Sequence, residues 1–334
     1  MPQYQPLISV IVPNYNHQAF LEERLASVFN QSYPNFEVIL LDDKSSDNSV
    51  EIIKRYAEHP LVSHVVLNSN NSGSPFSQWE KGIKLAKGEY IWIAESDDVA
   101  EQSFLSELME FMASLPHKLD VLYAQSVDID ESGQTLSSRL EYTADIVPNI
   151  WVDSFQMSGN VFINQYQKIK NVIPNASAVI FNRHKAQSID FSKPYSSMRT
   201  SGDRLFWIEM LKDGHIGFVA KTLNYFRTHS AVTRQHNTFD KVHRRCMEER
   251  LIRVYLADHF ACEQQRETKV LYRRWFAVNG LNALVKPLFY SVRMPYTSNI
   301  AYIWQFLLYR INNSELLQSI RYKLAKLRKN TVTP

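Results

Sequence analysis

The feature that most constrains this chain is an apolar run at residues 90–94 that leads directly into a cluster of acids. The run reads Tyr-Ile-Trp-Ile-Ala, a pattern typical of a buried strand in a parallel sheet. Glu95, Asp97 and Asp98 follow it. Open α/β sheets bind ligands at the carboxyl ends of their strands, and clustered carboxylates suit a hard divalent cation. The stretch therefore predicts a site for a metal and a diphosphate, although the same acids could instead form a solvated loop or cap a helix at 101–115.

Strand and helix patterns alternate from residue 7 to this acidic cluster. Apolar runs predict earlier strands at 7–12, 37–41 and 64–67. Apolar residues at helical spacing lie between the runs, and Asn16 or His17 can cap the first helix. A mostly parallel sheet flanked by helices accommodates this alternation.

A second pair of acids is expected at the same edge of the sheet. Asp42 and Asp43 follow the strand at 37–41, and parallel strands end on one side. The chain contains neither G-x-G-x-x-G nor G-x-x-x-x-G-K-[ST]. Phosphates bound here would therefore need another source of positive charge, and a metal held by carboxylates is the expected one.

Several motifs, taken together, resemble the family 2 glycosyltransferases of the GT-A fold. They cover residues 7 to about 110, in family order, and lie at 9–16, 41–47, 70–73, 82–91 and 95–98. The resemblance implies an α/β fold with a mostly parallel mixed sheet, flanked by helices and followed by a helical extension. It also implies an inverting, non-processive enzyme.

The resemblance assigns roles to individual residues. In such enzymes the loop after the first strand packs on the nucleobase, which implies contacts from Pro13, Tyr15 and Asn16. An acid after the second strand bonds the base or ribose, which points to Asp43 with Asp42 beside it.

The later motifs complete the implied donor site. Its further contacts are expected from Asn71, Gly73, Glu95, Ser96 and Asp97. The resemblance also implies Mn²⁺ or Mg²⁺ as cofactor, with Asp97 as first-choice ligand and Asp98 near it.

Three positions depart from the family pattern. Glu95 stands where the first Asp of D-x-D is usual, which keeps the charge but lengthens the side chain. Lys44 stands where Gly is common, so its loop must avoid a positive φ or carry strain. Trp79 and Glu80 replace an Arg-Asn pair, which removes a basic contact to the donor.

A further acid is expected to take part in catalysis. Asp203 lies in the first turn of a helix predicted at 201–211, where a helix N-terminus stabilises an anion. As an isolated residue it would be read as a helix cap. The position resembles the family's general base, so we assign Asp203 to remove the acceptor hydroxyl proton.

Two basic residues at the end of the last predicted strand and just after it are also assigned to the donor site. Short strands are expected at 217–219 and 223–227. The resemblance implies that Arg227 and His229 approach the diphosphate or the metal, although a lone His is often simply packed or solvated.

The middle of the chain carries weaker patterns. A strand is expected at 120–124 and a hairpin turn at 128–133. Residues 135–175 have little periodicity, and we assign them to the acceptor side because long irregular segments are often functional.

The charge distribution sets the last part of the chain apart. Residues 264–334 hold twelve Lys/Arg and two Asp/Glu, whereas residues 1–263 hold 25 and 32. Together with this difference in charge, the resemblance implies a catalytic domain at 1–235, with a nucleotide-sugar half at about 1–125 and an acceptor half at about 126–235, and a basic helical extension at 236–334.

The extension offers three readings. Helices expected at 239–262 and 267–285, and a basic run at 321–329, combine aromatics, Leu and cations in a way that suits the face of an anionic membrane. A helical cap with a solvated basic face fits equally well. Binding to nucleic acid is the least favoured of the three, because residues 1–263 are acidic overall and the sequence contains no recognised nucleic-acid-binding motif.

The remaining composition favours a cytoplasmic setting. Cys246 and Cys262 show no metal spacing and lie in or near one predicted helix, so a bond between them is not expected. The N-terminus lacks a signal-peptide pattern, and no apolar run is long enough to span a bilayer. We expect a cytoplasmic protein, peripheral on the inner face of the cell membrane if the extension binds lipid.

The sequence therefore predicts a metal-dependent inverting glycosyltransferase. Its expected donor is a UDP-sugar, since a uracil N–H suits a carboxylate acceptor, and its expected acceptor is a glycan or a lipid-linked glycan. The implied setting is bacterial surface polysaccharide assembly, such as capsule or lipopolysaccharide. Two alternatives remain open at this point: a sugar nucleotidyltransferase, and an inactive sugar-nucleotide-binding scaffold at a membrane.

Overall fold

The computed structural model describes residues 5–192, 194–195, 198–229 and 238–314. The chain divides into two compact units, Met1–Thr233 and Arg234–Pro334. Among the described residues, the first unit contains the whole sheet and the second is helical.

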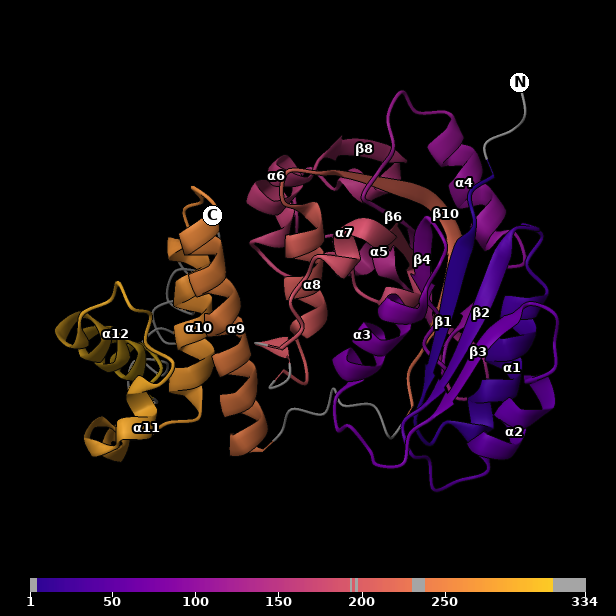
Figure 1. Ribbon diagram of the computed structural model, residues 1–334. Coiled ribbons are helices and arrows are strands. Elements are labelled where there is room, and N and C mark those ends of the chain that lie inside the picture. The colour runs from indigo at the N-terminus through magenta and orange to yellow at the C-terminus, as the bar shows by residue number, and fades with distance from the viewer. Residues whose placement is uncertain (1–4, 193, 196–197, 230–237, 315–334) are drawn as a thin grey trace, which may run out of the picture. The chain divides into compact units, whose positions relative to one another are not determined.

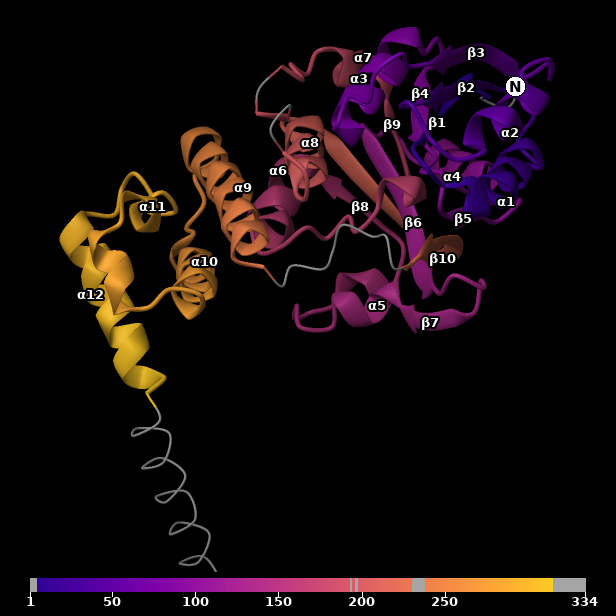
Figure 2. The ribbon, with the colours of Figure 1, turned by 90° about the horizontal axis from the view of Figure 1, so that it is seen from below.

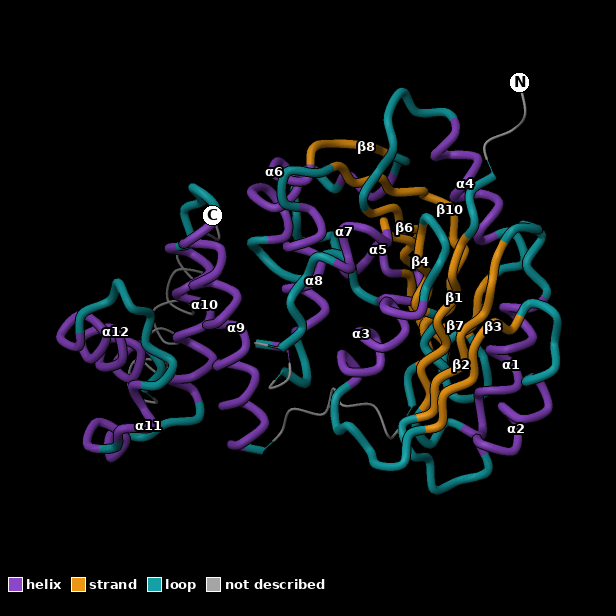
Figure 3. Tube along the Cα trace, in the orientation of Figure 1, coloured by secondary structure: helices purple, strands orange, loops and turns teal. Residues whose placement is uncertain are grey.

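Parallel strands form the first half of the sheet, as the alternating pattern predicts (Figure 1 and Figure 3). They pair in the order β3-β2-β1-β4. Their bounds are β1 Ile8–Asn14, β2 Phe36–Asp42, β3 Val62–Leu67 and β4 Tyr90–Ile93. Every residue of β1, β2 and β4 is buried, which explains why their sequences are almost continuously apolar.

The second half makes the sheet mixed. The order continues β9-β6-β10-β5, with β7 on β6 and β8 on β10. β9 is antiparallel to both of its neighbours, and β10 runs parallel to β6. The bounds are β5 Val99–Ala100, β6 Val121–Ile129, β7 Thr135–Ser138, β8 Phe155–Ser158, β9 Val179–Asn182 and β10 His215–Arg227.

Helices cover both faces of the parallel half (Figure 1). α1 (Gln18–Phe29), α2 (Ser49–Tyr56) and α4 (Phe104–Ala113) share one apolar core with alternate residues of the strands, such as Val10 and Trp92. α3 (Pro75–Leu85) lies on the opposite face, where Gly82 meets the side chain of Ile11. The period of two along a strand sends neighbouring residues to these two layers.

Short elements connect the sheet to the last helix of this unit. They are α5 Arg139–Tyr142, the 3₁₀ turn η1 Ile150–Val152, α6 Gly159–Phe162, the π-helix η2 Ile163–Gln167, the 3₁₀ turn η3 Ala176–Ala178, α7 Arg183–Gln187 and α8 Gly202–Leu211. Within 135–175, Trp151 donates from Nε1 to the Tyr123 hydroxyl at 2.6 Å and is buried. Part of this segment therefore belongs to the core rather than to a surface.

One strand prediction was wrong in its extent. The runs at 217–219 and 223–227 are one strand, β10, rather than two. Its pairing with β6 shifts between Val219 and Thr222 and again between Thr222 and Asn224. These irregularities absorb the polar residues that interrupt the apolar pattern, so the strand continues past them.

The second unit contains α9 (Phe239–His259), α10 (Gln265–Ala277), the 3₁₀ turn η5 (Leu281–Val285), α11 (Pro287–Tyr290) and α12 (Asn299–Asn312). The helix predicted at 267–285 was wrong in length, since α10 ends at Ala277, before Gly280. Cys246 and Cys262 are both free thiols, as expected. Within the described part of the chain no helix combines the length and apolarity needed to cross a membrane. The basic run at 321–329 lies outside the described residues.

A glycine fixes how closely the start of α8 approaches α3. A Cβ at Gly202 would overlap the Phe76 ring in the first turn of α3. We expect Gly202→Ala to lower the free energy of unfolding by about 1–3 kcal/mol, because the two helices must move apart. Urea denaturation measures this.

Phe76→Leu supplies the control, since it makes room at the same contact. The loss in the double variant should be smaller than the sum of the two single losses. Additive losses would mean that this contact does not set the helix spacing.

Candidate active site

The loops that follow β1, β2 and β4 are bonded to one another at one edge of the sheet. Asn14 donates from Nδ2 to Asp42 Oδ2 at 2.8 Å, which joins the ends of β1 and β2. His17 Nδ1 lies 2.8 Å from Ser96 Oγ, which joins the loops after β1 and β4. The convergence of the acidic loops at 42–43 and 95–98 is therefore confirmed, and its cause is the parallel direction of these strands.

A group of three side chains at this edge could hold a metal ion. One ligand atom from each of His17, Asp97 and His229 lies within 4.8 Å of the other two. His229 Nε2 is 3.1 Å from Asp97 Oδ2, and the two imidazole rings are 5.4 Å apart. Sequence analysis chose Asp97 and His229 but treated His17 as a helix cap. His17 does occupy the N-cap position of α1, yet its side chain makes no capping bond and contacts Ser96 instead.

Burial and neighbouring charges shift the pKa values of these three side chains. Burial raises the pKa of Asp97, but the hydrogen bond from His229 and the charge of His17 outweigh it, so the pKa lies below its ordinary value. The same bond to Asp97 raises the pKa of His229. Burial lowers the pKa of His17. At neutral pH Asp97 is thus an anion beside two imidazoles, and one carboxylate with two imidazole nitrogens is a donor set that a divalent transition metal could use.

Asp98 is buried beneath the group and, among the described residues, is not part of it. Its Oδ1 accepts from the Arg227 backbone N–H at 2.9 Å. Burial and the neighbouring Asp97 raise the pKa of Asp98 to about 7. The role of Asp98 as a metal ligand stays a prediction.

Arg24 of α1 supplies a buried positive charge near these acids. Its guanidinium lies over the Trp92 ring, 5.0 Å from the ring centre, and the side chain is fully buried. Burial lowers the pKa of Arg24 to about 10, against the opposing effect of Asp98 and Asp97. Sequence analysis missed this residue because a cation on the buried face of a helix has no motif of its own.

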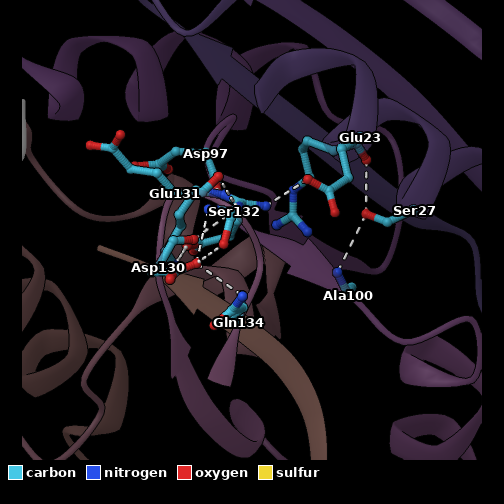
Figure 4. Close-up of polar contacts among 11 residues, drawn as sticks. Glu23, Ser27, Asp97, Ala100, Asp130, Glu131, Ser132 and Gln134 are labelled. Carbon is cyan, nitrogen blue, oxygen red and sulfur yellow. Dashed lines mark hydrogen bonds and ion pairs between the residues drawn. The ribbon is translucent and has the colours of Figure 1, made fainter. Parts of the chain in front are cut away.

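The buried side chain of Arg227 connects the acidic loop to two other segments of the chain. Its guanidinium donates to the backbone oxygens of Asp97 at 2.9 Å, Asp130 at 3.0 Å and Glu131 at 3.1 Å. It also pairs with Glu23 of α1 at 2.6 Å. Figure 4 labels these four partners. The predicted contact between Arg227 and the donor stays a prediction, and the bonds assign the side chain to holding three segments together.

Asp43 organises the neighbouring polar turn. Its Oδ1 accepts from Asn68 Nδ2, the Ser72 backbone N–H and Gln78 Nε2, at 2.7, 2.9 and 2.8 Å. Its Oδ2 accepts from Ser72 Oγ at 2.8 Å. Asn71 bonds the backbone oxygen of Asp43 at 2.9 Å.

The third motif forms a tight turn. Asn71 accepts from the Gly73 N–H at 2.7 Å, and Gly73 has a φ of +65°, which favours glycine. Asn71 and Gly73, which were both predicted to contact the donor, therefore lie in a turn that is hydrogen-bonded to Asp43.

The loops after β1 and β2 each contain a residue with positive φ. Asn16 (φ 55°) accepts from the Ser46 N–H at 2.7 Å, and Lys44 has φ 67°. Lys44 therefore takes the conformation that the family's glycine takes more easily. Tyr15 is exposed at this edge and Pro13 is buried.

Two departures from the family pattern contact one another. Trp79 donates from Nε1 to Glu95 Oε1 at 2.9 Å, so the longer acid reaches the indole that replaces the basic residue. Burial and the Asp97 charge raise the pKa of Glu95 to about 8, and the Trp79 bond acts against this. The Trp79 ring packs on Phe206 and Trp207 of α8, with ring centres 5.5 and 6.1 Å away.

Asp203 lies in the first turn of α8, as predicted. Its Oδ2 accepts from Asn171 Nδ2 at 2.7 Å, and the side chain is partly buried. Asn171 belongs to the segment assigned to the acceptor side. Because Trp79 packs on α8, the helix that presents Asp203 is tied to the loop that carries Glu95.

Comparison with known proteins gives one family. The model of glycosyl transferase family 2 matches residues 9–189. TuaG of Bacillus subtilis (strain 168), named for teichuronic acid biosynthesis, is 28% identical over 218 residues, which is 65% of this chain and 77% of TuaG. GlyG of Streptococcus pneumoniae serotype 4, a glycosyltransferase, is 36% identical over 126 residues, which is 38% of this chain but only 41% of GlyG.

Solved structures share the fold. The structure of Staphylococcus aureus TarS 1–349 in complex with UDP covers 91% of this chain and 90% of its own, with a TM-score of 0.62 at 18% identity. The complex of the same protein with UDP-GlcNAc has a TM-score of 0.58 at 20% identity and covers 93% and 83%. The GT-A architecture expected from the sequence is thus confirmed.

The bond between Trp79 and Glu95 can be tested by its contribution to stability. Trp79→Phe keeps an aromatic ring against α8 but leaves the partly buried Glu95 side chain, which its raised pKa keeps largely protonated at neutral pH, without this donor. We expect the free energy of unfolding in urea to fall by about 1–3 kcal/mol.

Trp207→Phe is the matched control. Trp207 is a neighbouring buried indole whose Nε1 has no hydrogen-bond partner among the described residues. Its replacement should cost clearly less than that of Trp79. Equal losses would mean that ring volume, not the bond to Glu95, accounts for the effect.

Proposed function

Because this chain belongs to glycosyl transferase family 2, we propose that it transfers a sugar from a nucleotide-diphosphate sugar to a glycan or lipid-linked acceptor, with inversion and with a divalent metal ion. The observation that carries the proposal is the meeting of His17, Asp97 and His229 at the carboxyl ends of the strands. This edge is where open α/β sheets bind ligands.

The proposed donor is a UDP-sugar. Support comes from TarS, whose solved structures hold UDP and UDP-GlcNAc in the same fold. The exposed ring of Tyr15 is available to pack on a base. Among the described residues Asp43 Oδ2 accepts one bond, from Ser72, which leaves a lone pair for a uracil N–H in this proposal.

The proposed cofactor is Mn²⁺ rather than Mg²⁺. One carboxylate and two imidazoles form a donor set that suits a transition metal, whereas Mg²⁺ prefers oxygen ligands and keeps several waters. His17, Asp97 and His229 would hold the ion. Bound there, it would supply charge that stabilises the leaving diphosphate.

We assign the general base to Asp203. A carboxylate that accepts an acceptor hydroxyl proton must be ionised and oriented, and Asn171 Nδ2 donates to Asp203 Oδ2. The first turn of α8 also favours the anion.

The proposed setting is the assembly of a bacterial surface polysaccharide at the inner face of the cell membrane. The name of TuaG refers to teichuronic acid biosynthesis, and that of TarS to a poly(ribitol-phosphate) β-N-acetylglucosaminyltransferase. One name refers to teichuronic acid and the other to a poly(ribitol-phosphate), and these polymers support the proposal of a polysaccharide or similar polymer as the acceptor. Membership of the glycosyltransferase family sets aside a nucleotidyltransferase.

The metal proposal predicts a specific loss in two variants. His17→Gln and Asp97→Asn should each weaken Mn²⁺ binding at least about tenfold, because each removes one ligand. Titration of Mn²⁺ followed by electron paramagnetic resonance measures the affinity. His184→Gln, which changes an exposed histidine outside the group, should bind as the natural protein does. Unchanged binding in both ligand variants would place the ion elsewhere.

If Asp203 is the general base, its replacement should lower turnover and leave donor binding intact. Asp203→Asn should lower kcat by roughly 10²-fold or more, since the amide cannot take up the proton. The rise in melting temperature with UDP-sugar and Mn²⁺ should persist, because the donor site is intact. Asp190→Asn, an exposed acid outside the site, is the control. Full turnover in Asp203→Asn would assign the base to another residue, and donor binding without turnover in the natural protein would favour the inactive scaffold.

A further inference from the structure

α12 has two apolar faces. Tyr302 and Phe306 are fully buried on one face. The other face presents Ile300, Trp304, Leu308 and Ile311, three or four positions apart, with 82, 62, 39 and 56% of their surface exposed. We call these four residues the α12 stripe. A helix that is apolar on both faces requires a partner on each.

The unit's own core already occupies the first face. Tyr302 packs on Tyr272 and Phe276, with ring centres 4.8 and 5.2 Å away. Phe306 packs on Phe276 and Phe289 at 5.2 and 4.9 Å. These contacts anchor α12 within its unit, beside α10 and α11 (Figure 2). The α12 stripe is therefore not needed to fold this unit.

The charge of the surrounding chain is of one sign. Residues 268–314 include six Lys/Arg and no Asp or Glu. Arg310 lies on α12 itself and is exposed, and Lys286 is exposed in the turn before α11. Val285 and Leu288 on either side of Lys286 are also exposed. Apolar and cationic groups thus lie close together on this part of the unit, whose exposed acids, such as Asp240 and Asp258, belong to α9.

We infer that the α12 stripe docks on the headgroup region of an anionic phospholipid bilayer. An exposed Trp among aliphatic side chains suits the interface between headgroups and acyl chains, and the neighbouring cations match anionic headgroups. A contiguous exposed apolar face on a monomer is otherwise unfavourable in water. The inference rests on the proposed membrane setting and identifies the surface that makes the contact.

Vesicle binding tests the inference with the full chain. Co-sedimentation with vesicles rich in phosphatidylglycerol should exceed that with phosphatidylcholine alone and should weaken as salt is added. The double variant Ile300→Glu, Trp304→Glu should reduce the partition coefficient about tenfold or more, because it places two acids on the α12 stripe. Its melting temperature should not change, since both side chains are exposed.

Leu136→Glu is the matched control, because it places an acid on an exposed apolar residue of β7 in the other unit. It should bind vesicles as the natural protein does. Equal binding by the stripe variant and this control would overturn the inference, as would equal binding to neutral vesicles. A dimer in solution that the stripe variant abolishes, without vesicle binding, would assign the α12 stripe to a second copy.

The test is independent of the proposed catalytic chemistry. It is run without donor or metal, and Asp203→Asn should bind vesicles normally. The stripe variant should still transfer sugar to a soluble acceptor. Loss of vesicle binding and loss of transfer therefore report on different parts of the account.

Discussion

The first unit depends on compensating the charge of a buried acidic loop. The loop after β4 carries Asp97 and Asp98 away from water, where an unpaired carboxylate is strongly unfavourable. His229, just beyond β10, contacts the Asp97 carboxylate, and Asp98 accepts from the backbone N–H of Arg227 at the end of β10, whose guanidinium binds the Asp97 backbone oxygen. Arg24 adds a buried charge from α1. These partners come from distant parts of the chain, so their contacts with the acidic loop hold those parts together. The same contacts leave the Asp97 carboxylate next to two imidazoles.

A second connection joins the donor loop to the helix that carries Asp203. In this chain the acid at 95 and the indole at 79 have both changed from the family pattern, and they bond to each other. The same indole packs on α8. A displacement of the loop would therefore be transmitted to α8 through packed rings rather than through flexible side chains. The two departures from the family pattern are thus compatible with each other, because they bond directly.

The sequence was sufficient to predict the parallel strands β1 to β4 and the edge at which the acids meet, because buried strands leave an unbroken apolar pattern and parallel strands end together. It also located Asp203 in the first turn of its helix. It did not indicate His17 as a possible ligand, since a residue after the first strand is equally suited to capping α1. Nor could it show that Asp43 and Arg227 each bond several backbone or side-chain groups, because such networks depend on residues 25 to 204 positions away. The continuity of β10 escaped prediction for a related reason: its irregular pairing with β6 accommodates a polar interruption that pattern reading takes as an end.

The central claim is that one cation and the diphosphate it accompanies are held where β1, β4 and β10 deliver His17, Asp97 and His229. Anomalous diffraction at the manganese edge, from crystals grown with Mn²⁺ and UDP, tests it most directly. The account predicts a single strong peak within bonding distance of all three side chains, with the diphosphate beside it. A peak bound by Asp98 without either histidine, or a diphosphate ordered on another surface, would contradict it.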